Sequence, residues 1–182
     1  FTASSYDNFS AVWASTHEES LKEFFRLPFV AGTFIWTGWD YLGEPTPYAW
    51  PSVSSYFGII DLAGFPKDTY YMYQSEWTDT PVLHLFPHWN WKQGENIDVA
   101  AYFNADEVEL FLNGRSQGTK RKQGDQMQVF WRLPFEPGVL KAVSRKNGQI
   151  AGQSSSVAGR IVISRRSSRR STRGGSPHGR CG

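Results

Sequence analysis

From residue 82 onward the sequence consists of short runs in which apolar and polar residues alternate, separated by turn signals at near-regular spacing. Runs of this length and period are typical of strands that turn one face toward a core. The Asn113-Gly114 pair predicts a tight hairpin because both residues tolerate positive φ, and Glu136-Pro-Gly138 marks another turn. The expected strands are 82–86, 97–103, 108–112, 128–133, 138–145 and, more weakly, 149–154. This pattern predicts a small antiparallel β-sandwich and a domain boundary near residue 80.

The residues before this boundary follow a different pattern. Residues 15–27 predict a helix with Ser15 or Thr16 as its cap, an acidic first turn and Pro28 at its end. Residues 29–36 then form a continuous apolar, β-branched and aromatic run of strand length, which is typical of a strand buried on both faces of a parallel sheet. A helix followed by a buried strand indicates an α/β unit.

Residues 37–67 are rich in Gly, Pro, Ser and aromatic residues, and a second helix is expected at 67–77. A connection of this length is usually functional or disordered, and its Trp and Tyr content argues against disorder. The chain as a whole holds 8 Trp, 8 Tyr and 13 Phe, more than a small core needs. Because large amphipathic rings also suit flat ligands such as sugar faces, we interpret 37–67 as a site loop.

The net charge of +2 conceals an uneven distribution. Seven of the 19 basic residues are arginines in 160–182, where there is no acidic residue, so the rest of the chain carries 12 bases against 17 acids. From Ser164 onward the tail has no apolar residue except Cys181 and is expected to be disordered, and a reading-frame change or truncated gene is the favoured explanation of its composition. Nucleic-acid binding by the tail is the alternative, and no nucleic-acid partner is expected for the remainder.

Cys181 is the single cysteine, so neither an internal disulfide nor a cysteine metal site is expected. His84 and His88 have a spacing that brings ligands together on a helix, but the strand and proline turn predicted there would keep them apart. No metal and no cofactor are therefore expected. No apolar run reaches membrane-spanning length, so no membrane partner is expected either. Because the chain begins at Phe1 without Met, the lack of a signal pattern is uninformative, and a bacterial periplasmic or extracellular location is suspected.

Several segments resemble glycoside hydrolase family 2, in its bacterial β-galactosidase-like branch. The barrel part of the resemblance is carried by Thr33-Phe-Ile-Trp-Thr-Gly-Trp-Asp-Tyr-Leu-Gly-Glu-Pro-Thr-Pro-Tyr48, by 54–68 and by Tyr70-Tyr-Met-Tyr73. The sandwich part is carried by Trp89-Asn-Trp91, Glu107-Val-Glu-Leu-Phe-Leu-Asn-Gly114 and Pro134-Phe-Glu-Pro-Gly138. The resemblance runs in order from about residue 5 to about residue 159.

The resemblance implies a mixed fold: the C-terminal segment of an α/β (β/α)8, or TIM, barrel at 1–80, an all-β immunoglobulin-like sandwich at 81–159, and the disordered basic tail at 160–182. It also implies retaining hydrolysis of glycosides by two glutamates. The family places both before Phe1, so no catalytic residue is expected here and the N-terminal domains of the same enzyme are an expected partner. The dipole of the predicted helix explains its own acids, Glu18, Glu19 and Glu23.

By the same resemblance, the substrate-binding candidates for a β-galactoside-type sugar follow the predicted strand. Trp36 is expected to stack under the sugar, with core packing as the alternative. Trp39 and Asp40 stand at the same mouth, and the alternative role of Asp40 is to anchor the loop. Glu44, in the loop after the strand, is expected to face the pocket, but it lacks a partner carboxylate at a defined place and is not expected to be catalytic. The remaining candidates are Tyr56 and Phe57, whereas packing is favoured for Tyr41, Tyr48 and Trp50.

Two functions follow from the resemblance. The first is a fragment of a β-galactosidase-like exo-glycosidase that is inactive alone. The alternative is a non-catalytic immunoglobulin-like module that binds carbohydrate or serves as a scaffold. Trp89 and Trp91 lie two residues apart and would share one strand face, where packing against the core or barrel is favoured over a sugar platform.

Overall fold

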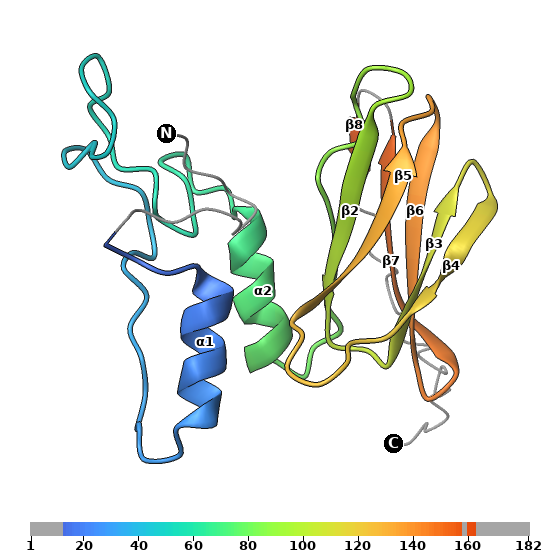
Figure 1. Cartoon of the computed structure of the whole chain (residues 1–182), viewed down its shortest axis with the longest axis horizontal. Coiled ribbons are helices and arrows are strands. Elements are labelled where there is room, and N and C mark those ends of the chain that lie inside the picture. The colour runs from blue at the N-terminus through green and yellow to red at the C-terminus, as the bar shows by residue number, and fades with distance from the viewer. Residues whose placement is uncertain (1–12, 158–159, 163–182) are drawn as a thin grey trace, which may run out of the picture.

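The computed structural model describes residues 13–157 and 160–162. Two helices and a long loop lie on one side of the molecule, and a β-sandwich lies on the other (Figure 1). The elements in chain order are α1 (His17–Arg26), α2 (Asp68–Trp77), β1 (Leu83–Phe86), β2 (Asn96–Phe103), β3 (Glu107–Leu112), β4 (Arg115–Lys120), β5 (Gln128–Pro134), β6 (Val139–Lys146), β7 (Gln149–Val157) and β8 (Arg160–Val162).

The strands form two antiparallel sheets with the orders β1-β2-β5 and β4-β3-β6-β7-β8. Each run predicted as a strand from residue 82 onward corresponds to one of these strands, so the all-β sandwich is confirmed. The β4 strand was not predicted because Arg-Ser-Gln-Gly-Thr-Lys contains no apolar residue to mark a buried face. It follows the expected hairpin, in which Asn113 and Gly114 have φ of 51° and 79°.

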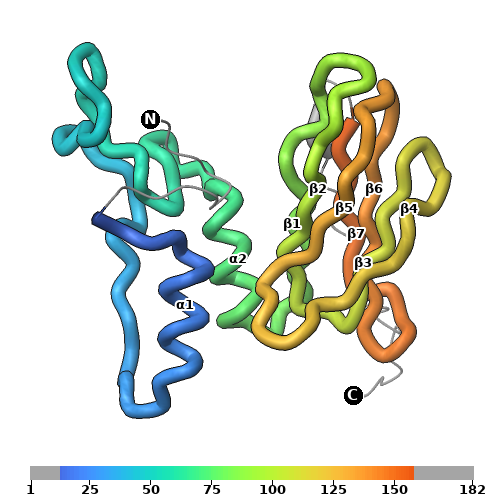
Figure 2. The backbone as a smooth tube through the Cα atoms, in the orientation of Figure 1, coloured from blue at the N-terminus to red at the C-terminus, as the bar shows by residue number. Residues whose placement is uncertain are grey.

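The main core fills the space between the two sheets. Its members are apolar side chains that point inward at every second position of β2, β3 and β5. Burial alternates along β3 and β5, whereas β2 is buried on both faces from residue 99 to residue 103 because its other face belongs to the core shared with the helices. Trp89, in the β1–β2 connection, is fully buried beside them. Figure 2 shows the backbone of the two sheets facing one another, with β1, β2 and β5 in one sheet and β3 and β6 in the other.

A second core joins the helices to the sandwich. Leu21 of α1 and Met72 of α2 are buried together with Phe86 and Tyr102, which point outward from the β1-β2-β5 sheet. In Figure 1, α2 lies between α1 and this sheet. Shared apolar burial of this kind stabilises the packing of the helices against the sandwich, across the boundary expected near residue 80.

Thr16 is the cap of α1. Its hydroxyl accepts a hydrogen bond from the Glu19 amide at 3.2 Å, and the Glu19 carboxylate accepts one from the Thr16 amide at 3.0 Å. This reciprocal capping box explains why the helix begins where the sequence predicted. The helix ends at Arg26, two residues before Pro28.

The same contacts should make the α1 cap sensitive to pH. Hydrogen bonds from the Thr16 amide and then the Thr16 hydroxyl hold the pKa of Glu19 below its ordinary value of 4.5. Because the folded pKa is depressed, the cap stabilises the helix above about pH 4.5 and is lost as the pH falls through the folded pKa. Thr16→Ala should raise the Glu19 pKa part of the way back, which carboxyl titration by NMR measures. An unchanged Glu19 pKa in this variant would contradict the capping explanation.

The prediction of a buried parallel strand at 29–36 is wrong for this structure. These residues belong to no strand, and Phe29, Phe34 and Trp36 are 80%, 102% and 74% exposed. The described residues just after this run form an isolated parallel bridge between Trp39 and Ile60 but no barrel strand, so the end of a barrel is not evident. An apolar run forms a buried strand only between neighbouring strands, and the described part of the chain supplies none on either side of 29–36.

Two expectations about the chain ends fall largely outside the described residues. The tail predicted at 160–182 is described only at 160–162, where β8 pairs with β7, and 163–182 lie outside. Residues 1–12 also lie outside. Within the described part, no helix is long and apolar enough to cross a membrane.

Candidate functional site

The loop at 37–67 is ordered by backbone hydrogen bonds between its two arms. The Asp40 amide donates to the Ile60 carbonyl at 2.8 Å, and the Ile60 amide donates to the Gly38 carbonyl at 2.9 Å. Farther along, the Gly43 amide donates to the Val53 carbonyl at 2.8 Å. These bonds hold the two segments predicted to carry site residues, 36–44 and 56–57, side by side.

Asp40 joins the arms through its side chain, which is buried. Its Oδ1 accepts a hydrogen bond from the Gly58 amide at 2.8 Å, and its Oδ2 lies 2.6 Å from Lys67 Nζ. Lys67 Nζ also donates to the Tyr56 carbonyl at 2.9 Å. A Cβ at Gly58 would lie 2.2 Å from the Asp40 nitrogen, so only glycine fits this crossing. Asp40 therefore anchors the loop, which is the alternative that the sequence left open for it.

Lys67 was not identified from the sequence as a partner of this site. Its side chain is only 17% exposed, and it reaches back from the entry of α2 to Asp40. The two residues are 27 positions apart in the chain. Two residues so far apart produce no periodic pattern in the sequence from which their contact could be predicted. The sequence indicated only that the two carry opposite charges in a mostly uncharged segment.

Trp36, Tyr41 and Glu44 form a second cluster at the mouth of the loop. The Tyr41 hydroxyl donates a hydrogen bond to the Glu44 carboxylate, while Glu44 has a left-handed φ of 44°. This bond raises the pKa of Tyr41 above its ordinary 10.0, and a weaker contact with the Trp36 side chain opposes the shift. The indole of Trp36 stays largely exposed, so its face remains open to a ligand.

The other predicted residues are divided between this cluster and its surroundings. Phe57 packs edge-to-face on Tyr41, with ring centroids 5.8 Å apart. Tyr56 packs on Tyr48 instead, at 5.0 Å. Trp39 is 61% exposed. The structure thus brings Trp36, Glu44 and Phe57 together around Tyr41, a residue for which the sequence favoured packing.

The acidic residues of α1 make structural contacts. Glu18 pairs with Lys22 at 2.8 Å and accepts a hydrogen bond from the Gln128 side chain of β5 at 2.8 Å, whereas Glu19 completes the capping box and Glu23 pairs with Arg26. Carboxylates held in this way on a helix surface stabilise the helix and are not presented to a ligand. Their prediction as structural residues agrees with these contacts.

The two histidines lie in separate environments. His84 Nε2 lies 2.5 Å from Asp68 Oδ1, and the His84 ring stacks on Tyr71 at 3.9 Å. His88 stacks on Trp91 at 4.8 Å. Among the described residues, no group of three or more His, Cys, Asp or Glu could hold a metal ion.

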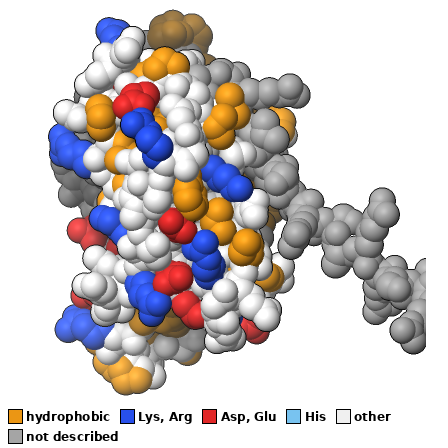
Figure 3. Space-filling model, turned by 90° about the vertical axis from the view of Figure 1, so that its right-hand side faces the viewer, with side chains coloured by type: hydrophobic (Ala, Val, Ile, Leu, Met, Phe, Trp, Pro, Cys, Tyr) orange, Lys and Arg blue, Asp and Glu red, His pale blue; other side chains and the backbone are white. Residues whose placement is uncertain are grey.

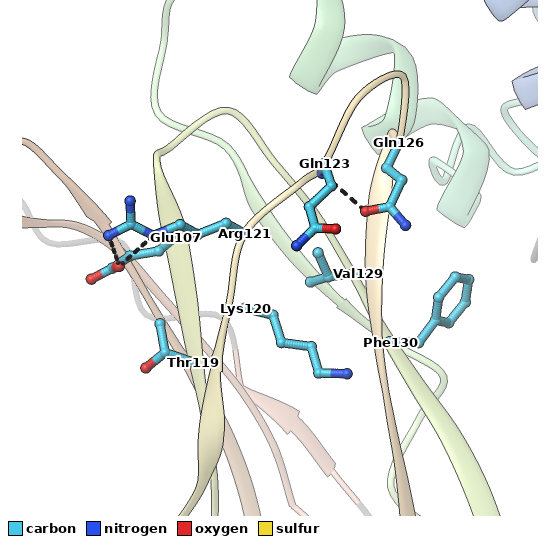
Figure 4. Close-up of a pocket in the computed structure, with 8 residues that line it drawn as sticks. All are labelled: Glu107, Thr119, Lys120, Arg121, Gln123, Gln126, Val129 and Phe130. Carbon is cyan, nitrogen blue, oxygen red and sulfur yellow. Dashed lines mark hydrogen bonds and ion pairs between the residues drawn. The ribbon is translucent and has the colours of Figure 1, made fainter.

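A hollow of about 630 Å³ lies away from this loop, on the sandwich. It is lined by Glu107 of β3, the end of β4, the β4–β5 connection and the start of β5, and Figure 4 shows Lys120 extending from β4 toward β5. None of its lining residues was predicted from the sequence as a site residue. Their polar types are those of an ordinary solvated edge, so the sequence held no signal for them.

Comparisons with known proteins cover both parts of the chain. A family model described as a domain of unknown function (DUF4982) matches residues 94–152. The chain is 60% identical over 154 residues to the β-galactosidase BoGH2A of Bacteroides ovatus, covering 84% of this chain and 18% of that protein. It is 44% identical over 161 residues to a putative β-glucuronidase of Formosa agariphila, covering 84% of this chain and 15% of that protein.

Solved structures agree. A β-glycosidase from Bacteroides vulgatus superimposes with a TM-score of 0.79 at 41% identity, over 86% of this chain and 20% of that one. A glycosyl hydrolase family 2 member from Bacteroides cellulosilyticus superimposes with a TM-score of 0.67 at 27% identity, over 78% of this chain and 23% of that one. The chain belongs to glycoside hydrolase family 2. The resemblance to this family that the sequence indicated is therefore confirmed. The chain spans less than a fifth of the length of the Bacteroides ovatus and Formosa agariphila relatives.

Proposed function

We propose that this chain is the C-terminal part of a β-galactosidase-like family 2 exo-glycosidase that hydrolyses terminal β-linked sugars with retention. The observation that carries the proposal is the 60% identity to a β-galactosidase over 154 residues. A span of that length in a chain of 182 residues must include the site loop at 37–67. In this proposal, residues 1–80 close a (β/α)8 barrel supplied mainly by sequence outside the chain. Residues 81–159 form an immunoglobulin-like domain, since β1-β2-β5 and β4-β3-β6-β7 parallel the A-B-E and C′-C-F-G orders.

The proposed role of the loop is to bind the sugar. The exposed face of Trp36 would stack on the C–H-rich face of a galactose-type ring, and Trp39, Glu44, Tyr56 and Phe57 would line the same mouth. Asp40 would act indirectly, by fixing the crossing of the two arms through Gly58 and Lys67. The two carboxylates that break the bond would come from upstream sequence, so the chain alone would be inactive.

The purified chain should give no turnover of an aryl β-galactoside above a buffer blank, because it lacks both proposed catalytic carboxylates. When it is joined to the upstream sequence of its gene, Trp36→Ala should lower kcat/KM about tenfold or more through lost stacking. Trp77→Ala, which removes an indole exposed on α2, is the matched control and should change kcat/KM less than about twofold.

Two results would contradict the proposal. Turnover by the isolated chain that disappears in Trp36→Ala would place catalysis within it. An upstream gene sequence without an Asn-Glu pair and a strand-end Glu before Phe1 would remove the expected catalytic pair.

A further inference from the structure

Helix α2 lacks a local signal that fixes its first residue. Its N-cap residue, Lys67, makes no side-chain capping hydrogen bond, in contrast to the capping box at the start of α1. The first amides of any helix have no partner within the helix, and helices of about ten residues are marginal in isolation. The place where α2 begins therefore depends on contacts with other parts of the fold.

One such contact comes from the sandwich, through His84 of β1. Its Nε2 lies 2.5 Å from Oδ1 of Asp68, the first residue of α2. The His84 ring also stacks on Tyr71, about one turn farther along α2, with centroids 3.9 Å apart and an angle of 8° between the planes. The side chains of His84 and Asp68 are only 19% and 18% exposed, so solvent ions screen their contact weakly. His84 therefore holds the first turn of α2 against the sheet.

The residue next to Asp68 is the one that joins the two arms of the site loop. The Lys67 amide donates to the Ile59 carbonyl at 2.9 Å, which ties the start of α2 to one arm. Lys67 Nζ contacts Asp40 of the other arm and accepts no competing partner in the loop except the Tyr56 carbonyl, to which it donates at 2.9 Å. A displacement of the first turn of α2 would move the amide and the side chain of Lys67 together, and would loosen both arms.

A second ion pair holds the far end of α2 to the sandwich. Nζ of Lys122, in the β4–β5 connection, lies 2.6 Å from Oε1 of Glu76. Both side chains are 21% exposed, close to the values for His84 and Asp68. Glu76 follows Asp68 by eight residues, which corresponds to about 12 Å along the helix axis. This pair has a similar exposure but lies away from the site loop.

The opposite side of the sandwich has the character of an ordinary solvated surface. In Figure 3, which views the molecule from the side away from the helices, acidic and basic side chains are interspersed among hydrophobic and uncharged ones. Charged residues of the β4-β3-β6-β7-β8 sheet pair within that sheet, as Glu109 does with Arg145 at 3.0 Å. The contacts that connect the sandwich to the site loop are therefore on its helix side.

We propose that His84 is a positioning residue, through which the sandwich fixes the site loop. His84 holds Asp68, and Asp68 keeps its neighbour Lys67 where Lys67 bridges the two arms. The sandwich thus acts on the loop without contacting a ligand. The benefit to sugar binding rests on the proposed function, whereas the linkage itself concerns contacts within this chain.

Hydrogen exchange at the Gly58 amide of the whole chain tests this linkage, because that amide donates across the crossing of the two arms. His84→Phe keeps a ring that can stack on Tyr71 but removes the donor to Asp68, and it should accelerate exchange at Gly58 about tenfold. His84→Gln retains an N–H donor and should change the rate less than about threefold. Asp68→Ala breaks the same contact from the side of α2 and should reproduce the acceleration.

Lys122→Met is the matched control, because it breaks the other pair between α2 and the sandwich. It should accelerate exchange in the last turn of α2 and change the rate at Gly58 less than about twofold. Exchange of the core amides of β3 measures any general loss of stability, against which the rates at Gly58 are compared.

Three results would overturn the proposal. The first is an unchanged rate at Gly58 in both His84→Phe and Asp68→Ala. The second is an equal acceleration in Lys122→Met, which would mean that any weakening of the helix packing is sufficient. The third is an equal acceleration in His84→Gln, which would assign the effect to packing rather than to the donor. These rates require no substrate, so a failure of the linkage is observed separately from a failure of the proposed function.

Discussion

Trp89→Ala should lower the free energy of unfolding of the sandwich by about 3–5 kcal/mol, the usual cost of truncating a large buried aromatic residue. The Trp89 side chain is fully buried and packs on Phe135, with ring centroids 5.1 Å apart. Its indole donates to the Glu136 carbonyl at 3.0 Å, and its amide donates to Ser156 Oγ at 3.0 Å. The substitution leaves a cavity and an unsatisfied carbonyl where the β1–β2 and β5–β6 connections meet β7.

Urea unfolding followed by circular dichroism in the β-sheet band measures this effect. Trp50→Ala is the matched control, because it removes the same side chain from a position that is 84% exposed, and it should cost less than about 0.5 kcal/mol. A loss below about 1 kcal/mol in Trp89→Ala would mean that Trp89 does not support the core.

Lys67→Met should destabilise the crossing of the site loop by about 3 kcal/mol, because it leaves a buried carboxylate unpaired. The Asp40 side chain is 6% exposed and lies 2.6 Å from Lys67 Nζ. The Gly58 amide donates a hydrogen bond to Asp40 directly. The Ile60 amide, two residues farther along the same arm, donates to the Gly38 carbonyl on the arm that carries Asp40. Hydrogen exchange at these two amides should accelerate about a hundredfold, since 1.4 kcal/mol corresponds to a factor of ten.

Two further variants separate the charge from other effects. Adding Asp40→Asn to Lys67→Met removes the unpaired charge and should restore much of the protection. Lys22→Met breaks a more exposed pair with Glu18 on α1 and should leave exchange at Gly58 and Ile60 unchanged. If the double variant exchanged as fast as Lys67→Met, the unpaired charge would not be the cause.

Some residues of the candidate site were selected from the sequence. Trp36 and Asp40 were selected because they follow a strand-like run in a segment that resembles family 2. The structure assigns Asp40 to loop anchoring and adds Tyr41 as the residue that links Trp36, Glu44 and Phe57. These assignments depend on which side chains meet across the two arms, which local sequence does not encode.

The sequence by itself determined the two helices, the Thr16 cap, the sandwich strands with an apolar face, and the family. Each of these depends on residues close together in the chain, through capping, turn chemistry and the two-residue period of a strand. Tertiary structure alone decided that 29–36 form no strand here, that Lys67 reaches Asp40, and that β4 and β5 leave a hollow between them. Pairing and burial are supplied by distant segments, so an apolar run or a charged residue has no fixed role until its partners are in place.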